Sequence, residues 1–235
     1  MKKTLVSFGG LEVGENRHNY AYNLHRNYTA EVQRLFRSGA PYFDNFWMYD
    51  NNWLLNSPYF QTDAKRVLSC HSFGWAFKSI SIHDALSMVD NDDIVMWVDS
   101  NDLIVGDPQP IFDSLYQCGI FCHDHSPTYY RTARWTHKDM FVGMGCDEKR
   151  YWDTPQIQVN WLAFQKNTFV MNFVEEWVKC SIDYDVMIKN ELENDVDFVQ
   201  HRHEQSIFSI LREKYSLPYY KGYPKMFHEE MGICM

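Results

Sequence analysis

Apolar and polar positions along the chain follow two recurring patterns. Short apolar runs closed by turn-forming or acidic residues, and alternating apolar and polar residues, are typical of strands. They predict strands at 5–8, 43–49, 94–98, 119–123 and 158–165, and a short strand or extended segment at 66–69. Apolar residues at three- and four-residue spacing predict helices at 16–38, 75–89, 111–116, 136–144, 168–184 and 204–215.

The order of these elements predicts the fold class. Short strands that alternate with helices of about 12 or more residues form βαβ units around a mostly parallel central sheet. The stretches 51–60, 126–134 and 190–197 show no clear period and are predicted connections, and Thr136 is a candidate helix cap. No repeat or convincing linker interrupts the chain. We therefore predict one α/β, Rossmann-like domain over residues 1–235, flanked by helices, with an irregular tail from about 217.

Composition narrows the class of protein. The chain has 15 Tyr, 16 Phe and 8 Trp, a surplus that lines sugar pockets in some proteins and fills large cores in others. A net charge of −9 argues against broad binding to nucleic acid or to an anionic membrane. It remains compatible with a nucleotide whose phosphates are bridged by a metal ion.

The chain shows no sign of export or of membrane insertion. No run of ~18 apolar residues is present, and the apolar part of residues 1–10 is too short for a signal peptide. The six cysteines are scattered, which favours reduced thiols over a disulfide framework. We predict a cytoplasmic protein with no transmembrane segment and no nucleic-acid partner.

The apolar run 94–98 ends in Asp99-Ser100-Asn101-Asp102. Ligand sites in open α/β sheets lie beyond the carboxyl ends of the strands. Grouped oxygen atoms there suit Mn²⁺ or Mg²⁺, which binds a diphosphate with one or two protein ligands. A sharp turn can point Asp99 and either Asn101 or Asp102 at one site. The alternative is an ordinary turn, because Asp, Ser and Asn form turns without any metal.

A second polar group, His201-Arg202-His203-Glu204-Gln205-Ser206, precedes the last predicted helix. The dipole at a helix N-terminus stabilises an anion, so we expect Glu204 to be ionised, partly exposed and usable as a base, with His203 as the cap. One alternative is an ordinary charged first turn. Another is a zinc site built on His201 and His203, for which the sequence offers no evident third ligand.

Two weaker segments could also contact a ligand. Residues 73–78, Phe-Gly-Trp-Ala-Phe-Lys, could bring Lys78 to a phosphate, or could be a glycine turn followed by buried aromatic residues. Residues 135–139 and 153–156 mix polar and aromatic side chains, as sugar-contacting loops do, but a capped surface helix and a loop give the same pattern.

Taken together, these segments resemble the GT-A-fold nucleotide-sugar glycosyltransferases, in particular small bacterial and large-DNA-virus members. The family pattern has a Gly-Tyr-Trp-x-Trp-Lys-Pro-like segment, a strand that ends in a DXD-type motif, and a late His-Arg-His-Asp-Gln-Ser segment. The resemblance runs from about residue 5 to residue 215. Its parts here are Phe8-Gly9, 74–78, 92–101, 136–139, Gln165-Lys166-Asn167 and 201–206.

The resemblance implies a role for each matching residue. Asp99 would bind the donor ribose or the water shell of the metal, and Asn101 would approach the metal, with Asp102 as its substitute. Glu204 would deprotonate the acceptor hydroxyl. The remaining donor-binding residues implied are Phe8 and Gly9 near the uracil or other base, Lys78, Ser100 and His203.

The implied reaction is transfer of a hexosyl group from a nucleoside diphosphate sugar, a UDP-sugar first of all, to a hydroxyl of a glycan or similar acceptor. Assistance by Mn²⁺ or Mg²⁺ and inversion at the anomeric carbon are expected. The chain departs from the family where Asn101 replaces an Asp, Ser79 a Pro and Glu204 an Asp. The alternatives are a nucleotidyltransferase that makes the sugar nucleotide, and a non-catalytic protein that binds carbohydrate or nucleotide sugar.

Overall fold

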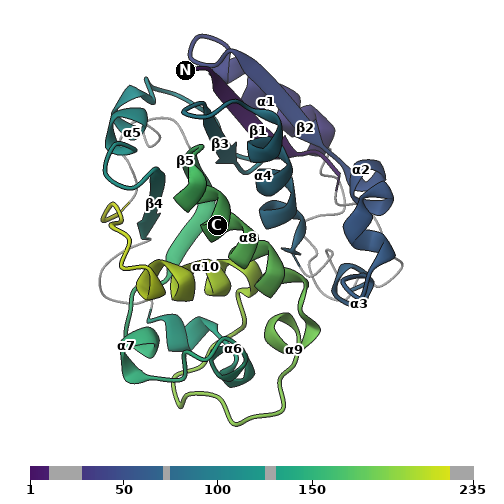
Figure 1. Ribbon diagram of the computed structural model, residues 1–235, viewed down its shortest axis with the longest axis vertical. Helices are drawn as coiled ribbons and strands as arrows, with labels where there is room; N and C mark the ends of the chain where they lie inside the picture. The colour runs from purple at the N-terminus through teal and green to yellow at the C-terminus, as the bar shows by residue number, and fades with distance from the viewer. Residues whose placement is uncertain (11–27, 71–74, 125–130, 223–235) are drawn as a thin grey trace.

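A computed structural model of the protein describes residues 1–10, 28–70, 75–124 and 131–222. At its centre lies a five-stranded sheet in the order β2-β1-β3-β5-β4 (Figure 1). The strands are β1 (Lys3–Phe8), β2 (Asn45–Tyr49), β3 (Ile94–Val98), β4 (Ile120–Asp124) and β5 (Ile157–Gln165). β1 pairs in parallel with β2 and β3, whereas β5 runs antiparallel to both β3 and β4. Four strands therefore share one direction, which confirms the predicted α/β class with a mostly parallel sheet.

The longer helices follow the periodic segments of the sequence. They are α1 (Tyr28–Gly39), α4 (Phe77–Met88), α5 (Gln109–Ser114), α6 (Lys138–Gly143), α8 (Thr168–Ile182) and α10 (His203–Lys214). The first twelve residues of the helix predicted at 16–38 lie outside the described part of the chain. Asn167 caps α8 through a hydrogen bond from the backbone N–H of Val170 to its side chain (2.9 Å), which explains where that helix begins.

Short helices account for most differences from the sequence-based expectation. They are α2 (Asn51–Asn56), η1 (Pro58–Gln61), α3 (Lys65–Leu68), η3 (Thr132–Trp135), α7 (Lys149–Trp152) and α9 (Tyr184–Met187). The predicted strand at 66–69 is wrong, since these residues belong to α3 and its end. The predicted connection at 51–60 contains α2, which Asp50 caps by accepting the backbone N–H of Trp53 (2.8 Å). The predicted cap at Thr136 is also wrong, because α6 begins one residue later with His137 as its cap.

Helices cover both faces of the sheet. Helices α4, α8 and α10 pack on one face, as seen in front of the strands in Figure 1, and together with it form the larger apolar cluster. A smaller cluster on the other face joins α1 and α5 to β1, β3 and β5. The strand β3 is buried along its whole length between the two clusters. Such burial on both faces explains why its sequence is a continuous apolar run.

The strand β5 contains an irregularity where it passes β4. Phe121 of β4 faces Ala163, but His123, two residues on, already faces Gln158, so extra residues of β5 bulge out between them. As a result Val159 packs in the cluster that includes Leu162, and not with Trp161 as strict alternation predicts. Bulges often occur beside functional sites, since they redirect backbone groups. This one lies next to the carboxyl end of β3, because the backbone N–H of Asp99 donates to the carbonyl of Asn160 (2.9 Å).

Candidate functional site

Three ionisable side chains that are distant in sequence meet beyond the carboxyl end of β3. Asp99 directly follows this strand, Lys78 comes from the first turn of α4, and Glu204 from the first turn of α10. The Lys78 ammonium lies 3.0 Å from Asp99 Oδ1 and 3.6 Å from Glu204 Oε1. We call these three residues the carboxylate–lysine cluster. The structure therefore brings together the residues for which the sequence predicts donor contact and base function.

Lys78 is the centre of the cluster. Its side chain is 5% exposed, and its ammonium also donates to the backbone carbonyl of Val159 (3.0 Å) in the β5 bulge. Burial alone would lower the pKa of Lys78, but Asp99 and Glu204 outweigh burial and raise the pKa above its usual value. Lys78 is therefore charged, and it holds two carboxylates from different elements in place.

Glu204 is buried, with a side chain 6% exposed, so the expectation of a partly exposed, plainly ionised residue is wrong. Burial raises the pKa of Glu204 to about 7, against the opposing charge of Lys78. Trp177 of α8 donates its indole N–H to the backbone carbonyl of Glu204 (3.0 Å), which fixes the first turn of α10. A carboxylate with a pKa near neutrality is suited to general acid–base chemistry.

Asp99 is the cluster member that solvent reaches most easily, with a side chain 33% exposed. Its Oδ1 atom accepts from the Lys78 ammonium and from the indole N–H of Trp97 (2.8 Å). Both contacts hold the carboxylate in one orientation. Asp99 thus offers a fixed negative group at the edge of the sheet where ligands bind in α/β folds.

Asp102 has a different environment from Asp99. It is 4% exposed and accepts hydrogen bonds from Asn160 (3.2 Å) and from the indole N–H of Trp161, both on β5. Burial raises the pKa of Asp102 to about 6, with the charge of Asp99 adding to the shift. Asp102 therefore anchors the turn after β3 to β5, and we leave it out of the metal ligands proposed below.

The remaining residues of the predicted metal set fit a cation held by few protein atoms. Asp99 is partly exposed and Asn101 is exposed, so both side-chain oxygens can reach a ligand. Within the described ranges, no three His, Cys, Asp or Glu side chains form a group that could enclose a metal ion. Mg²⁺ bound through substrate phosphates needs only one or two protein ligands, so Asp99 and Asn101 satisfy that requirement.

The other predicted donor residues surround the cluster less closely. Ser100 is buried, and its hydroxyl lies 3.5 Å from the Glu31 carboxylate. Phe8 is 3% exposed and packs on Phe77 with ring centroids 4.4 Å apart, so its ring offers little surface to a nucleotide base. Gly9 follows β1, and its backbone N–H donates to the carbonyl of Tyr49 (2.7 Å).

His203 is the first residue of α10 and has a positive φ of 49°, although the cap of this helix is Arg202. Its ring lies 4.8 Å from that of His201, which in turn stacks on His137 at 4.0 Å. Burial, followed by the two neighbouring histidines, lowers the pKa of His201 well below its usual value. His201 Nε2 contacts the carbonyl of Met187 (3.0 Å). This packing and bonding explain the paired histidines without zinc.

The part of the site that β5 supplies is not evident from the sequence. Val159 contributes a backbone carbonyl to Lys78, and Asn160 and Trp161 bond to Asp102. Trp97 was predicted only as an apolar strand residue, yet its indole N–H orients Asp99. The one available signal was the polar Asn160 inside a buried apolar strand, since a buried polar side chain requires a hydrogen-bonding partner.

Comparisons with known proteins agree with this architecture. No family model and no curated protein matches the chain. Among solved structures, it is similar to apo mouse xyloside xylosyltransferase 1, with 10% identity and a TM-score of 0.50 over 94% of this chain and 85% of that one. An active-site mutant of LgtC aligns with 12% identity and a TM-score of 0.44, over 93% and 72% of the two chains. The likeness to the xylosyltransferase shows that the chain has an α/β fold of the GT-A glycosyltransferase type.

The structure also bears on the expectations about membrane insertion and disulfide bonds. Among the described residues, no helix is long and apolar enough to cross a membrane. The five described cysteines form no disulfide, and Cys234 lies outside the described part of the chain.

Proposed function

We propose that this protein is a glycosyltransferase that moves a hexosyl group from a nucleoside diphosphate sugar, with UDP as the first candidate nucleotide, to a hydroxyl of a glycan or similar acceptor. The observation that carries the proposal is the carboxylate–lysine cluster at the carboxyl edge of the sheet, in a fold shared with a xylosyltransferase. Ligands bind at this edge in α/β folds. Two of the three groups have shifted pKa values, as is common at functional sites.

Each member of the cluster has a distinct task in this proposal. Asp99, the exposed member, binds the ribose of the donor or the water shell of its metal. Glu204 accepts the proton of the acceptor hydroxyl, for which a pKa of about 7 is well matched near neutral pH. Lys78 is too deeply buried for broad contact with the donor, so it is a positioning residue that acts through the two carboxylates. One base on the face opposite the leaving group gives inversion.

A divalent ion would be held by Asp99 and Asn101 together with the donor diphosphate. When bound, Mn²⁺ or Mg²⁺ neutralises the negative charge that develops on the leaving diphosphate. Transfer should therefore fall at least tenfold in EDTA and recover with added manganese. Unchanged transfer in EDTA would remove the metal from the proposal.

The substitution Glu204→Gln tests the base. It keeps the size of the side chain but cannot take a proton, so transfer should fall at least 100-fold while the dissociation constant of the donor changes less than threefold. Glu213→Gln, at the far end of the same helix, is the matched control and should retain activity. Near-normal transfer by Glu204→Gln would exclude Glu204 as the base.

The products that form distinguish the proposed function from its alternatives. A nucleotidyltransferase would form a sugar nucleotide from a nucleoside triphosphate and a sugar 1-phosphate, and a binding protein would hold the nucleotide sugar without turnover. The anomeric configuration of the product, read by proton NMR, distinguishes inversion from retention.

A further inference from the structure

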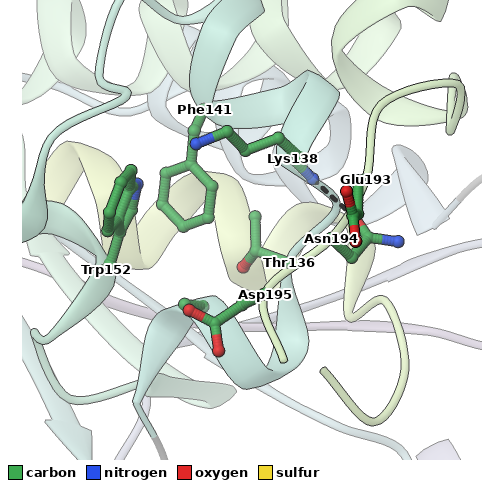
Figure 2. A pocket seen from close by; sticks show the side chains of 8 residues that line it. Thr136, Lys138, Phe141, Trp152, Glu193, Asn194 and Asp195 are labelled. Atoms are coloured by element: carbon green, nitrogen blue, oxygen red, sulfur yellow. Dashed lines mark hydrogen bonds between the residues drawn. The ribbon is translucent and has the colours of Figure 1, made fainter. Parts of the chain in front are cut away.

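A polar hollow is lined by residues other than those of the carboxylate–lysine cluster. It lies between α6, α7 and the segment 193–195 and has a volume of about 220 Å³. Figure 2 shows the side chains that line it. We call it the α6–α7 pocket. It is lined by Ala133, Thr136, Lys138, Phe141, Trp152, Glu193, Asn194 and Asp195. Pockets for larger ligands usually occupy about 300 Å³ or more, so this one has the size for a single small ring and not for a nucleotide sugar.

The apolar part of the pocket is a rigid aromatic surface. Trp152 is half-buried, and its indole N–H donates to Asp147 (3.1 Å). The Lys138 ammonium lies 4.2 Å from the centre of the Trp152 ring and also pairs with Asp147 (2.5 Å). Phe141 forms a second aromatic wall, visible between Trp152 and Thr136 in Figure 2. Such a surface suits a ligand with an apolar face.

The polar part of the pocket contains a buried hydroxyl without a partner. Thr136 is 1% exposed, and within the described part of the chain its Oγ1 atom has no hydrogen-bonding group. Figure 2 shows this oxygen directed into the space that Trp152, Phe141 and Asp195 surround. A buried polar atom left unpaired costs free energy, so its position here indicates that a ligand or water supplies the partner.

The charges around the pocket limit the chemistry of that ligand. Glu193 and Asp195 disfavour phosphate and other anions. A free cation is disfavoured too, because the Lys138 ammonium lines the pocket and Arg131 lies 3.6 Å from Asp195. A neutral molecule with hydroxyl groups that both donate and accept fits the Thr136 hydroxyl and the carboxylates together. With an apolar ring face added, this description is that of a sugar residue.

The pocket shares its support with the carboxylate–lysine cluster. The backbone carbonyl of Trp135, next to Thr136, accepts from the backbone N–H of Arg202 (2.9 Å) and from the hydroxyl of Ser206 (2.7 Å). Glu204 lies between these two donors in the first turn of α10. The wall of the pocket and the proposed base are therefore fixed to the same turn.

We propose that the α6–α7 pocket binds one neutral sugar residue of the acceptor. That the sugar belongs to an acceptor rests on the proposed function. Binding of a sugar at the pocket is a separate property. It also gives a function to residues 135–139, whose polar and aromatic character is otherwise explained only as a capped surface helix.

The test is binding of simple sugars without any nucleotide. Ligand-observed NMR would measure the methyl glycosides of glucose, galactose, mannose and N-acetylglucosamine with the wild-type chain, at millimolar concentration. At least one should bind, and Thr136→Val and Trp152→Leu should each weaken it at least fivefold. Thr136→Val removes only the unpaired hydroxyl, so its melting temperature should not fall. Glu191→Gln, an exposed neighbour outside the pocket lining, is the matched control and should bind as the wild type does.

The results distinguish failure of the pocket proposal from failure of the proposed transferase. Binding of no glycoside by the wild type, or equal binding by Thr136→Val in a folded state, would overturn the pocket proposal. UDP-sugar binding, measured in parallel, should be unchanged in both pocket variants. Glycoside binding that depends on Thr136, in a protein that binds no nucleotide sugar, would support a sugar pocket and contradict the proposed transferase.

Discussion

At the scale of single residues, the site depends on Lys78. Its ammonium compensates two carboxylates, one of which is itself buried. Removal of one partner from a buried ion pair is costly because the other charge remains without compensation. Exposed pairs, by contrast, contribute little. The chain offers both kinds, which permits a direct comparison.

Lys78→Met should therefore lower the free energy of unfolding by about 3 kcal/mol. Lys214→Met removes the exposed pair with Glu176, whose ammonium–carboxylate distance is 2.6 Å, and should cost less than about 1 kcal/mol. Urea denaturation at pH 7 measures both. Equal, small losses would mean that Lys78 does not compensate the two carboxylates in the folded chain.

The pKa of Glu204 predicts how activity and stability depend on pH. Because the folded pKa of about 7 lies above the usual value of ~4.3, protonation favours the folded state, and stability falls as pH rises from about 4 to about 7. Glu204→Gln removes this contribution, so wild type minus variant stability should decrease over that window. Transfer activity should rise as the pH increases through about 7, because only the ionised carboxylate can accept a proton. A flat stability difference from pH 4 to 8 would contradict the shifted pKa.

At the scale of elements, close contacts at turns determine how near a helix can pack to the sheet. Gly119 precedes β4 with a φ of +77°, and a Cβ there would lie 2.7 Å from Asn167 Nδ2 and 2.8 Å from Val170 Cγ2. These residues form the capped start of α8. Gly145 has a φ of +64°, but no atom lies within 4 Å of an added Cβ.

The two glycines separate backbone strain from crowding. Gly145→Ala should lower the free energy of unfolding by about 1 kcal/mol, which is the cost of holding an alanine in the left-handed backbone conformation. Gly119→Ala should cost about 3 kcal/mol, because overpacking against α8 adds to that cost. Chemical denaturation of both variants gives the difference directly. Equal losses would show that α8 can move away from the turn before β4.

The elements also show what the sequence can predict. The strand β3 and the helices α4, α8 and α10 lie close to their predicted ranges. β3 is an apolar run bounded by acidic residues, and α8 and α10 carry their buried apolar residues at helical spacing. The short helices α2 and α3 were missed, since four to six residues contain too little of a period to distinguish helix from turn or strand. The reversed direction of β5 was not predicted, because an alternating pattern is the same in either direction.

At the scale of the whole molecule, the order of the strands brings the site together. Lys78 and Glu204 are 126 positions apart in the sequence. In the fold, Lys78 contacts both Glu204 and Asp99, the residue that follows β3. The sequence and its family resemblance named Asp99, Lys78 and Glu204 separately. Their meeting, and the burial of Glu204, depend on long-range packing of α4 and α10 on the sheet. The bulge of β5 that supplies the Val159 carbonyl likewise appears only in the folded chain.

We propose above all that Asp99 and its cluster form a nucleotide-sugar donor site. Its most direct test is the dissociation constants of UDP-, GDP- and dTDP-sugars, by calorimetry in manganese, for the wild type and two variants. Asp99→Asn removes the partly exposed carboxylate of the cluster, whereas Asp92→Asn changes an exposed residue that precedes the start of β3. The wild type should bind at least one nucleotide sugar, Asp99→Asn at least tenfold more weakly, and Asp92→Asn equally well. Absence of binding by the wild type, or equal binding by Asp99→Asn, would contradict the claim.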